Sequence, residues 1–509
     1  MYRKDWIGKW AEYFPEKIAI SEFESGRKVT YARLNDWAVA VAAKLTIDYG
    51  LQKGDRLAII AENHLEQFVL FSAAQKSGLI LAPLNYRLAP PEIAFMLKDA
   101  RPSILFIENK YRTKYQGLLG NPSFKVIPLS EIAEWEQSAD SAGAEFPANT
   151  AIRENDPILI LYTSGTTGFP KGALYTHKML FWNSINTALG LELTTGDRTI
   201  TCLPLFHTGG WNVFSTPFLH HGAYFCLLQK FDADLILKLL DREEITIFFG
   251  VPTILNLMLS SPLFPEAELS KVRYFIVGGE ALPLPVIEAW HQKGIPIRQG
   301  YGLTEVGPNV TSLHQDDAVR KKGSIGRPNF YIDTRIVDEA GRPVAPGAPG
   351  ELLLKGPVVT PGYWQNVEET RRAFSGGWFH TGDIVRQDDE GYLFVVDRKK
   401  NMYISGGENV YPVEVEKLLY SHPKISEAAV IGVPDAQWGE VGKAFVVPQP
   451  GTDISAEEII AFCEGKIAKY KIPKYIEFLD CLPRGDTGKI ERKKLNGLPP
   501  ATEKPPSDR

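Results

Sequence analysis

Short apolar runs alternate with longer segments of helical periodicity over most of the chain before Lys321. The runs Arg56–Ile60 and Ile104–Ile107 have the length of strands that are buried on both faces. The segments His64–Lys76 and Pro90–Lys98 have the length and spacing of helices. Strands that alternate with helices predict parallel sheets that are covered by helices on both sides. We therefore predict an α/β fold for this part of the chain.

The pattern changes after Lys321, where glycine and proline become frequent. Short strands such as Thr334–Val337 and Glu351–Lys355 follow without long helices, which predicts a small β-barrel-like subdomain. A small α+β domain comes next, in which a helix pattern at Pro412–Leu419 alternates with strand patterns. The predicted organisation is a large N-terminal domain at 1–397, a hinge at 398–400, a small mobile C-terminal domain at 401–497 and a disordered tail at 498–509.

The composition is that of a folded protein, because 44% of the 509 residues are hydrophobic and 23% are charged. These values exclude a mainly disordered chain, a collagen and a coiled coil. The net charge of −5 lacks the basic excess of a protein that binds duplex nucleic acid. We therefore expect no nucleic-acid partner.

The four cysteines are Cys202, Cys226, Cys463 and Cys481, and they form no CxxC pair. This spacing argues against a disulfide framework or a cysteine zinc site and favours a reducing compartment. The first residues lead into no apolar segment of a signal peptide, and no clean apolar run reaches the roughly 20 residues of a membrane span. We therefore expect a cytoplasmic protein without a transmembrane segment, and the sequence leaves peripheral membrane contact and a homodimer open.

The first chemically informative segment is 162–172, which reads YTSGTTGFPKG and follows a predicted buried strand. Its glycines allow backbone N–H groups to turn toward an anion, its serine and threonine hydroxyls donate further hydrogen bonds, and Lys171 adds a positive charge. This combination suits a polyphosphate, although the spacing is not that of a Walker A loop. A flexible surface loop of the same composition is the alternative.

Two further segments follow predicted strands. In 299–305, which reads QGYGLTE, Tyr301 offers a ring face to a base, Thr304 a donor to a phosphate and Glu305 a hard oxygen ligand to Mg²⁺. A plain strand-end turn is the alternative there. The segment 278–281, which reads GGEA, also ends a predicted strand. Ligands of open α/β sheets bind outside the carboxyl ends of the strands, so these segments together favour one shared crevice.

These segments resemble the signatures of the adenylate-forming superfamily, which includes acyl-CoA synthetases, luciferases and the adenylation domains of peptide synthetases. Segment 162–172 resembles the phosphate loop of that family, and 299–305 is similar to its YGxTE motif. Further matches follow in the order of the family at 381–383, 397–400, 405–412 and 483–489. On these motifs the chain is identified as a member of the superfamily, and it looks most like bacterial fatty-acyl-CoA synthetases.

The resemblance implies two half-reactions. A carboxylate attacks the α-phosphate of MgATP to give acyl-AMP and pyrophosphate, and a thiol then attacks the acyl group and releases AMP. The implied fold is a large N-terminal domain of parallel α/β sheets with a β-barrel-like subdomain, followed by a small mobile α+β C-terminal domain. The implied cofactor is Mg²⁺, and the implied substrates are ATP, CoA and a small-molecule carboxylic acid.

The resemblance also implies the site residues. The expected ATP- and AMP-binding residues are Thr163, Ser164, Gly165, Thr166, Thr167, Gly168, Lys171, Gly279, Glu280, Ala281, Gln299, Gly300, Tyr301, Gly302, Thr304, Asp383, Arg398 and Lys489. The expected catalytic residues are Lys489, Thr304, Glu305 and His207, and the expected Mg²⁺ ligands are Thr163 and Glu305. The expected hinge residue is Lys400, and the expected CoA-side residues are Ser405, Gly406 and Gly407. Ordinary solvated charges are the alternative for Lys400 and Lys489.

Segment 204–212, which reads PLFHTGGWN, resembles the motif beside the acyl pocket of the family, with His207 near the carboxylate and Trp211 as a gate. A core position is the alternative for either side chain. The stretch from Pro204 to Lys230 contains no aspartate that would pair with an α-amine, so an amino acid substrate is disfavoured. The apolar residues nearby favour a fatty or an aromatic acid and do not decide between them.

CoA is the expected acceptor, on the motif at 405–412 and on a chain without a carrier domain. Three alternatives stay open: an acyl-AMP ligase that serves a carrier protein, a luciferase-like oxygenase that uses the adenylate, and a non-catalytic nucleotide-binding regulator. The presence of Lys489 and Glu305 argues against the regulator.

Overall fold

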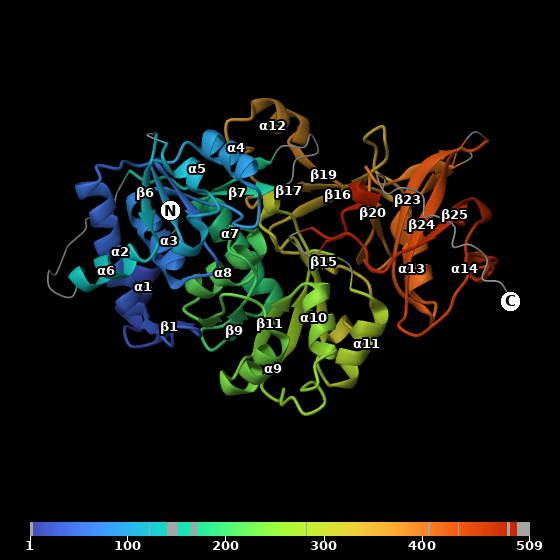
Figure 1. Cartoon of the computed structure of the whole chain (residues 1–509), viewed down its shortest axis with the longest axis horizontal. Helices are drawn as coiled ribbons and strands as arrows, with labels where there is room; N and C mark the ends of the chain where they lie inside the picture. Colours follow the sequence, from blue (N-terminus) through green and yellow to red (C-terminus); the bar gives the residue numbers. More distant parts are fainter. Residues whose placement is uncertain are drawn as a thin grey trace. The chain divides into compact units, whose positions relative to one another are not determined.

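Parallel β-sheets covered by helices make up most of the N-terminal part of the chain (Figure 1). The computed structural model describes residues 4–121, 123–139, 151–163, 170–280, 282–405, 408–435, 437–485 and 489–495. By its internal contacts the chain divides into a first unit, Met1–Thr334 with Leu354–His380, and a second unit, Arg335–Leu353 with Thr381–Arg509.

The longest sheet of the first unit has the strand order β6-β5-β3-β4-β7-β8. Its strands are β3 (Arg56–Ile60), β4 (Ile80–Pro83), β5 (Ile104–Ile107), β6 (Lys125–Pro128), β7 (Pro157–Thr163) and β8 (Lys171–Thr176). Neighbouring strands are parallel except for β8, which is antiparallel to β7. Alternate residues of β3 lie in different hydrophobic cores, Leu57 and Ile59 in one and Ala58 and Ile60 in another. A strand that packs on both faces needs apolar residues at every position, which explains its continuous apolar run.

Helices cover both faces of this sheet, namely α2 (Tyr31–Ala43), α3 (Leu65–Ser77), α4 (Pro90–Ala100), α5 (Gln116–Leu119) and α6 (Glu131–Ala139). Phe68 of α3 packs in the core that holds Leu57, and Ile93 of α4 packs in the core that holds Ala58. α3 is buried over its whole length and ends at Gly78, whose φ of 81° is the left-handed conformation that glycine adopts without strain. The predicted α/β architecture of this region is confirmed.

A second sheet of the first unit has the order β2-β1-β10-β9, and a third has the order β11-β12-β13-β14-β15. Their strands are β1 (Ile18–Glu22), β2 (Lys28–Thr30), β9 (Arg198–Thr201), β10 (Tyr224–Leu227), β11 (Ile247–Gly250), β12 (Tyr274–Val277), β13 (Ile297–Tyr301), β14 (Thr311–Ser312) and β15 (Arg327–Pro328). The neighbouring helices are α1 (Trp6–Tyr13), α7 (His177–Leu191), α8 (Ser215–His220), α9 (Ala233–Arg242), α10 (Pro252–Leu259) and α11 (Leu284–Gln292). Because β11, β12 and β13 are parallel, their carboxyl ends meet at one edge.

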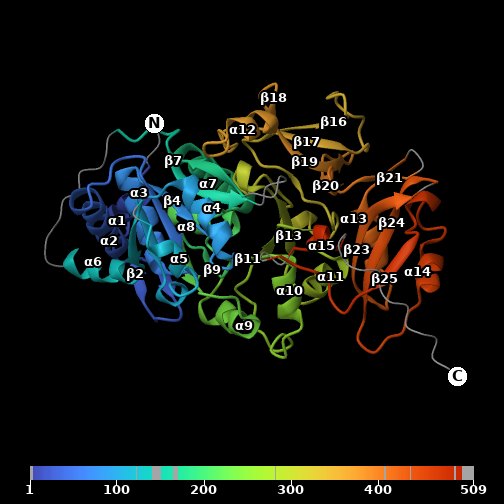
Figure 2. The same ribbon diagram turned by 45° about the horizontal axis from the view of Figure 1, so that its top comes forward.

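Antiparallel strands dominate the later part of the chain, which Figure 2 shows in yellow to red. One sheet has the order β16-β17-β19-β18, with β20 beside β19, and the C-terminal sheet has the order β22-β21-β24-β23, with β25 beside β24. The strands are β16 (Asp333–Val337), β17 (Gly350–Lys355), β18 (Phe374–Ser375), β19 (Trp378–Gln387), β20 (Leu393–Arg398), β21 (Tyr403–Ser405), β22 (Glu408–Val410), β23 (Ile425–Asp435), β24 (Gly439–Pro448) and β25 (Tyr475–Phe478). The helices are α12 (Val367–Ala373), α13 (Pro412–Tyr420), α14 (Ala456–Cys463) and α15 (Arg492–Leu495).

The predicted sheet and α+β arrangement of this region are confirmed, with longer strands than expected. The hairpin of β23 and β24 is paired from Ile425 opposite Pro448 to Asp435 opposite Gly439. The middle of each strand is buried and apolar, and most residues toward the ends are partly exposed, so an apolar pattern alone does not mark where the strands end. None of the helices within the described residues is both long enough and apolar enough to cross a membrane.

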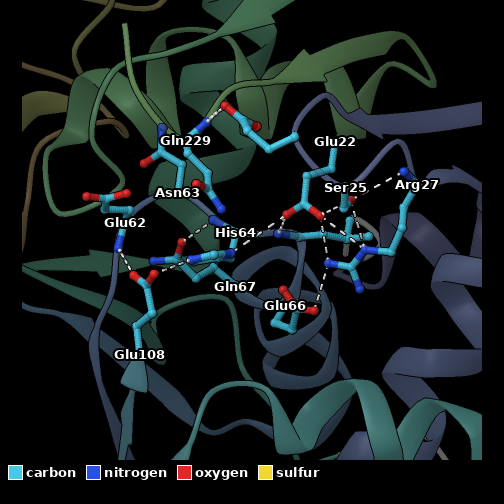
Figure 3. A network of polar contacts seen from close by, with 12 residues as sticks. Glu22, Ser25, Arg27, Glu62, Asn63, His64, Glu66, Gln67, Glu108 and Gln229 are labelled. Atoms are coloured by element: carbon cyan, nitrogen blue, oxygen red, sulfur yellow. Dashed lines mark hydrogen bonds and ion pairs between the residues drawn. The ribbon is translucent and has the colours of Figure 1, made fainter. Parts of the chain in front are cut away.

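A polar network lies at the carboxyl ends of β1, β3 and β5 (Figure 3). The guanidinium of Arg27 lies 2.8 Å from the carboxylates of both Glu22 and Glu66, and Nε2 of His64 lies 3.3 Å from Glu108. Glu22, His64 and Glu66 each place one oxygen or nitrogen within 4.8 Å of the others, a spacing that a metal ion would accept. Because Arg27 already forms ion pairs with both carboxylates, we interpret the cluster as an ionic clamp between these strand ends.

This clamp predicts a pH dependence of stability. Burial alone would lower the pKa of His64, but the hydrogen bond and charge of Glu108 outweigh it, so the pKa of His64 is raised. A raised folded-state pKa stabilises the fold below the ordinary value of about 6.5, and this contribution is lost as the pH rises through the folded-state pKa. We therefore expect His64→Gln to lower the thermal unfolding midpoint more at pH 5.5 than at pH 9.

The ionisation of Glu108 does not change between the two pH values of this comparison. Burial would raise its pKa, but hydrogen bonds from His64 and Lys110 lower the pKa to about 2, so its carboxylate stays ionised from pH 5.5 to pH 9. A wild-type minus His64→Gln difference that is the same at both pH values would contradict the ionic role of His64.

Candidate active site

The ends of β7 and β8 bring together two residues of the expected phosphate loop. Thr163, the last residue of β7, is paired with Lys171, the first residue of β8. The hydroxyl of Thr163 donates to the carbonyl of Lys171 at 3.5 Å. The residues between them, Ser164, Gly165, Thr166, Thr167 and Gly168, lie outside the described residues. Both described ends of the segment therefore lie at the same edge of the sheet.

The ends of β12 and β13 bring the other two expected nucleotide segments side by side. Val277 is paired with Gln299, so Gly278–Glu280 and Gly300–Gly302 leave neighbouring parallel strands. Gln299 is buried, and its side-chain oxygen accepts a hydrogen bond from the backbone of Leu282 at 3.0 Å. Gln299 thus fixes the course of the neighbouring loop, and Ala281 lies outside the described residues.

Gly302 is the residue at which the second segment turns. A Cβ at this position would lie 1.8 Å from the carbonyl oxygen of Pro308, so a larger residue would displace the backbone. Tyr301, Thr304 and Glu305 are half-buried on either side of this turn. The segment therefore packs closely against the backbone of Pro308, which leaves no room for a side chain at residue 302.

Glu305 is anchored to a distant part of the first unit. Its carboxylate accepts a hydrogen bond from the hydroxyl of Tyr363 at 2.9 Å, and its backbone carbonyl accepts one from the N–H of Thr360 at 2.7 Å. Burial, together with the negative charge of Glu305, raises the pKa of Tyr363, so the phenol stays a donor. The hydroxyl of Thr360 donates in turn to Leu174 of β8 at 2.8 Å. These bonds link the expected Mg²⁺ ligand to the strand that carries Lys171.

Lys171 forms a hydrogen-bonded ion pair with Glu369 of α12. Both side chains are largely buried, with 11% and 14% of their surface exposed. The hydrogen bond from Lys171 is the main reason why the pKa of Glu369 is lowered. Neither the sequence pattern nor the family resemblance pointed to Glu369, which lies 198 residues away along the chain.

The segment that carries His207 is fixed by Asn63, which lies between β3 and α3 (Figure 3). The side-chain amide of Asn63 donates to the carbonyls of Leu203 and Leu228, each at 3.0 Å, and its oxygen accepts from the N–H of Leu205 at 3.0 Å. Asn63 is 1% exposed, so these bonds are shielded from water. The sequence analysis missed Asn63, because an isolated asparagine before a helix signals a turn or a cap just as well.

A buried network of amides connects the His207 segment with the segment after Glu305. Asn212 donates to the hydroxyl of Thr208 at 3.2 Å, and its carbonyl accepts from Asn183 at 2.7 Å. Asn309 donates to the carbonyl of Val213 at 3.1 Å. The hydroxyls of Thr208 and Tyr175, a residue of β8, lie 2.7 Å apart. The expected acid-binding and nucleotide-binding segments of the first unit are therefore joined by hydrogen bonds.

A small pocket opens beside the π-helix at Gly209–Val213, which follows His207. Its walls are formed by Ile200, Thr201, Cys202, Leu203, Gly209, Gly210, Phe214, Ser215 and Phe249. The described residues in these walls carry no acidic, basic or histidine side chain. Burial raises the pKa of the Cys202 thiol to about 12, so the thiol is neutral at physiological pH. A charged group in this pocket would find no counter-ion among these residues.

Trp211 lies in the hydrophobic core rather than in the wall of this pocket. It is fully buried, its ring centroid lies 5.0 Å from that of Phe68 and 5.5 Å from that of Phe71, and its N–H donates to the carbonyl of Leu205. This environment is that of a core aromatic, the alternative that the sequence left open for Trp211. His207 is half-buried beside Phe206, with ring centroids 4.5 Å apart.

The second unit contains the remaining predicted residues. Asp383 and Arg398 are paired across β19 and β20, and Nε of Arg398 lies 2.6 Å from Oδ1 of Asp383. Lys400 is exposed, and partial desolvation of its ammonium together with the positive charge of Arg398 lowers its pKa. Ser405 is a buried residue of β21, whereas Gly406 and Gly407 lie outside the described residues.

Lys489 is exposed at the end of a short hairpin in the second unit. Its carbonyl accepts from the N–H of Gly485 at 2.8 Å, and Arg484 forms a β-bridge with Ile490. Residues 486–488 lie outside the described residues. The backbone of Lys489 is thus paired with that of Gly485, while its side chain is exposed.

Comparison with known proteins identifies the family. The model of the AMP-binding enzyme family matches residues 7–364, and that of the AMP-binding enzyme C-terminal domain matches residues 414–489. The chain belongs to the family of AMP-binding enzymes. The predicted membership of the adenylate-forming superfamily, in its acyl-CoA synthetase branch, is therefore confirmed.

The similar proteins are CoA ligases. The chain is 39% identical to an indoleacetate–CoA ligase of Aromatoleum aromaticum, with 98% of each chain covered, and 37% identical to the long-chain-fatty-acid–CoA ligase FadD13 of Mycobacterium tuberculosis, with 94% of each covered. The solved structure of o-succinylbenzoate CoA synthetase from Bacillus subtilis with its acyl-adenylate has a TM-score of 0.86, at 32% identity over 97% of this chain and 98% of that chain.

We expect Trp211→Ala to act on stability. Removing a fully buried tryptophan typically costs about 3–5 kcal/mol, because transfer free energy is lost and a cavity remains. The measurement is denaturant unfolding of the variant beside Trp438→Ala, which removes a tryptophan that is 48% exposed and should change stability little. A stable Trp211→Ala protein with an altered preference among acids would instead establish the gate role.

Proposed function

We propose that the protein is an AMP-forming acyl-CoA synthetase. It activates a carboxylic acid with ATP, releases pyrophosphate, and transfers the acyl group from acyl-AMP to CoA. The observation that carries this proposal is the position of Thr163, Lys171 and Glu305 around β8, in a chain that CoA ligases match over nearly its whole length. We expect the enzyme to act in the cytoplasm on a small-molecule acid.

The residues of the first unit bind the triphosphate and the base in this proposal. Lys171 and Thr163 bind the β- and γ-phosphates, Thr304 contacts the α-phosphate, and Tyr301 stacks on adenine beside Gly279. Charge on the two reacting anions is the main barrier to bringing them together, so a lysine at this edge favours the reaction by holding the phosphates in place.

Mg²⁺ fits the residues that the structure places at this edge. The carboxylate of Glu305 and the hydroxyl of Thr163 are hard oxygen donors of the kind that Mg²⁺ prefers, and they are the residues that would hold it. Bound Mg²⁺ would neutralise part of the negative charge of the phosphates. The relative from Bacillus subtilis has also been solved with ATP and magnesium ion.

The residues of the second unit contribute the ribose contact and the catalytic lysine. Asp383 accepts hydrogen bonds from the ribose hydroxyls, and Arg398, whose Nε lies 2.6 Å from its carboxylate, orients it. Lys489 stabilises charge that develops during adenylation. Ser405 and the glycines after it face CoA, and rotation at Lys400 serves the two half-reactions in turn.

The acid has an uncharged tail in this proposal. The residues around the π-helix Gly209–Val213, which follows His207, are apolar or neutral, and a buried charge without a partner is costly. This favours a fatty or an aryl acid over an amino acid. Transfer to a carrier protein and a luciferase-like oxygenation of the adenylate are the alternative fates of acyl-AMP.

The test of the proposed function is a screen of ATP–pyrophosphate exchange over a panel of fatty, aryl and amino acids. Acids that support exchange are then incubated with ATP and CoA, and the thioester is detected by mass spectrometry. Exchange without a thioester, or light emission and oxygen consumption, would favour the alternatives. Absence of exchange with every acid would contradict the proposal.

Lys489→Ala separates the half-reactions. An ammonium that stabilises charge in the adenylation transition state raises the rate of that step, and losing such a group typically costs about 10²–10³-fold. We expect pyrophosphate exchange to fall by this factor, while preformed acyl-adenylate and CoA react at close to the wild-type rate. Equal loss of both half-reactions would mean that Lys489 does not have this role.

Lys400→Pro tests the hinge. Proline fixes φ near −65° and removes a backbone donor, so it restricts rotation at this residue. We expect thioester formation to suffer more than pyrophosphate exchange, measured on the same preparation. Lys400→Ala, which removes the side chain and leaves the backbone free to rotate, is the control for loss of the lysine itself. Equal damage to both steps by Lys400→Pro would contradict a hinge at this residue.

A further inference from the structure

One segment of the first unit binds two groups of the proposed ATP site. The backbone of residues 362–364 pairs with β8, through a hydrogen bond from Leu174 to the carbonyl of Gly362 at 3.2 Å and one from Trp364 to the carbonyl of Gly172 at 2.7 Å. Within these residues, the hydroxyl of Tyr363 binds Glu305. Further along the chain, in α12, the carboxylate of Glu369 binds Lys171, the first residue of β8. The segment is therefore fixed to β8.

The two oxygens of Glu369 have different partners. Oε2 binds the ammonium of Lys171, and Oε1 accepts from the guanidinium of Arg372 at 2.9 Å. Arg372 is 66% exposed, lies one turn further along α12 than Glu369, and also binds Glu368 at 3.0 Å. The backbone N–H of Glu369 is itself capped by the side chain of Asn366 at 3.1 Å, which fixes the first turn of the helix.

Glu369 and the phosphates of ATP require the same ammonium. A largely buried ion pair is held more tightly than a surface pair because solvent screens it less. A bound triphosphate brings several negative charges toward Lys171, and a lysine has three donors but one charge to share. Any free energy that holds Lys171 on Glu369 is therefore lost from ATP binding.

We propose that Glu369 is a positioning residue that holds Lys171 in the nucleotide-free enzyme and sets the affinity for ATP by competing with the β- and γ-phosphates. Arg372 retains the carboxylate of Glu369 when Lys171 moves to the phosphates, so no buried charge is left without a partner. The proposal rests on the proposed function, because it takes Lys171 as a phosphate ligand. AMP has no β- or γ-phosphate, so its binding does not involve this competition.

The test is direct titration of ATP and of AMP, without acid, by isothermal calorimetry. Glu369→Gln keeps the shape of the side chain and removes its charge, so we expect the Kd of ATP to fall by about tenfold, which corresponds to about 1.4 kcal/mol. The Kd of AMP is expected to stay unchanged. Arg372→Gln removes the second partner of Glu369, ties the carboxylate more strongly to Lys171, and is expected to raise the Kd of ATP.

Neighbouring residues of α12 supply matched controls. Glu368 and Arg371 are 69% and 75% exposed, carry the same charges one residue earlier, and make no ion pair with Lys171 among the described residues. Arg371→Gln should leave the ratio of the two Kd values within about twofold of wild type, although it removes the same charge as Arg372→Gln. Glu368 also binds Arg372, at 3.0 Å, so Glu368→Gln leaves Arg372 to Glu369 and should lower the Kd of ATP less than Glu369→Gln does. An equal effect of Arg371→Gln and Arg372→Gln, or of Glu368→Gln and Glu369→Gln, would mean that only the general electrostatic field is involved and would overturn the proposal.

Other outcomes also decide the question. Weaker ATP binding by Glu369→Gln would mean that the carboxylate orients Lys171 for the phosphates, and an equal change for ATP and AMP would show that the variant disturbs the site as a whole. Either result would overturn the proposal. Arg372→Gln gives an independent test of opposite sign if Glu369→Gln fails to fold. A wild-type protein that binds neither nucleotide would contradict the proposed function instead.

Discussion

The site depends on the backbone of β8, the antiparallel edge strand of a sheet that is otherwise parallel. Its turn-back from β7 puts Thr163 opposite Lys171. Along the same strand, the hydroxyl of Tyr175 lies 2.7 Å from that of Thr208, in the expected acid-binding segment. The carbonyl of Leu174 accepts a hydrogen bond from Thr360, and the N–H of Thr360 donates to the backbone carbonyl of Glu305. The expected phosphate, acid and magnesium residues are thus held by one element.

Burial of this strand explains why such an arrangement is stable. The backbone groups on one side of β8 pair with β7, and some of those on the other side pair with residues 362–364. Few local groups are left to water, so the polar side chains at the end of the strand can be positioned precisely enough to bind anions without a large reorganisation on binding. The amides of Asn63, Asn183 and Asn309 extend the same principle to the loops, since each satisfies backbone carbonyls that the loops would otherwise bury unpaired.

Much of this architecture was predictable from local signals in the sequence. The continuous apolar runs at β3 and β5 indicated parallel strands, because both faces of such strands contact helices. The segments after β7, β12 and β13 were recognisable because glycine, hydroxyl and charged residues follow a buried strand directly. Asp383 and Arg398 had to come from the family resemblance, and the ion pair that they form across β19 and β20 was not predicted.

Other features left no local signal. Glu369 and Tyr363 lie far along the chain from the residues they contact, and a glutamate in the first turn of an exposed helix is an ordinary residue by sequence. The aromatic Trp211 fits a pocket and a core equally well by composition, and only the position of α3 against it decides for the core. Long-range packing therefore determines what the pattern could not.

The cover of β8 by residues 362–364 has a consequence for how the chain can be divided. An edge strand with unpaired N–H and C=O groups is a template for strands of other molecules. The edge of β8 is covered by residues 362–364, which come after the chain has passed through residues 335–353 of the second unit. A shortened chain that stops at residue 334 would contain nearly all the helices and sheets of the first unit, yet it would expose this edge and be prone to aggregate. The solubility of the first unit therefore depends on residues 362–364, which follow the first passage of the chain through the second unit. A boundary for expressing the first unit alone does not fall near Lys321, where glycine and proline become frequent.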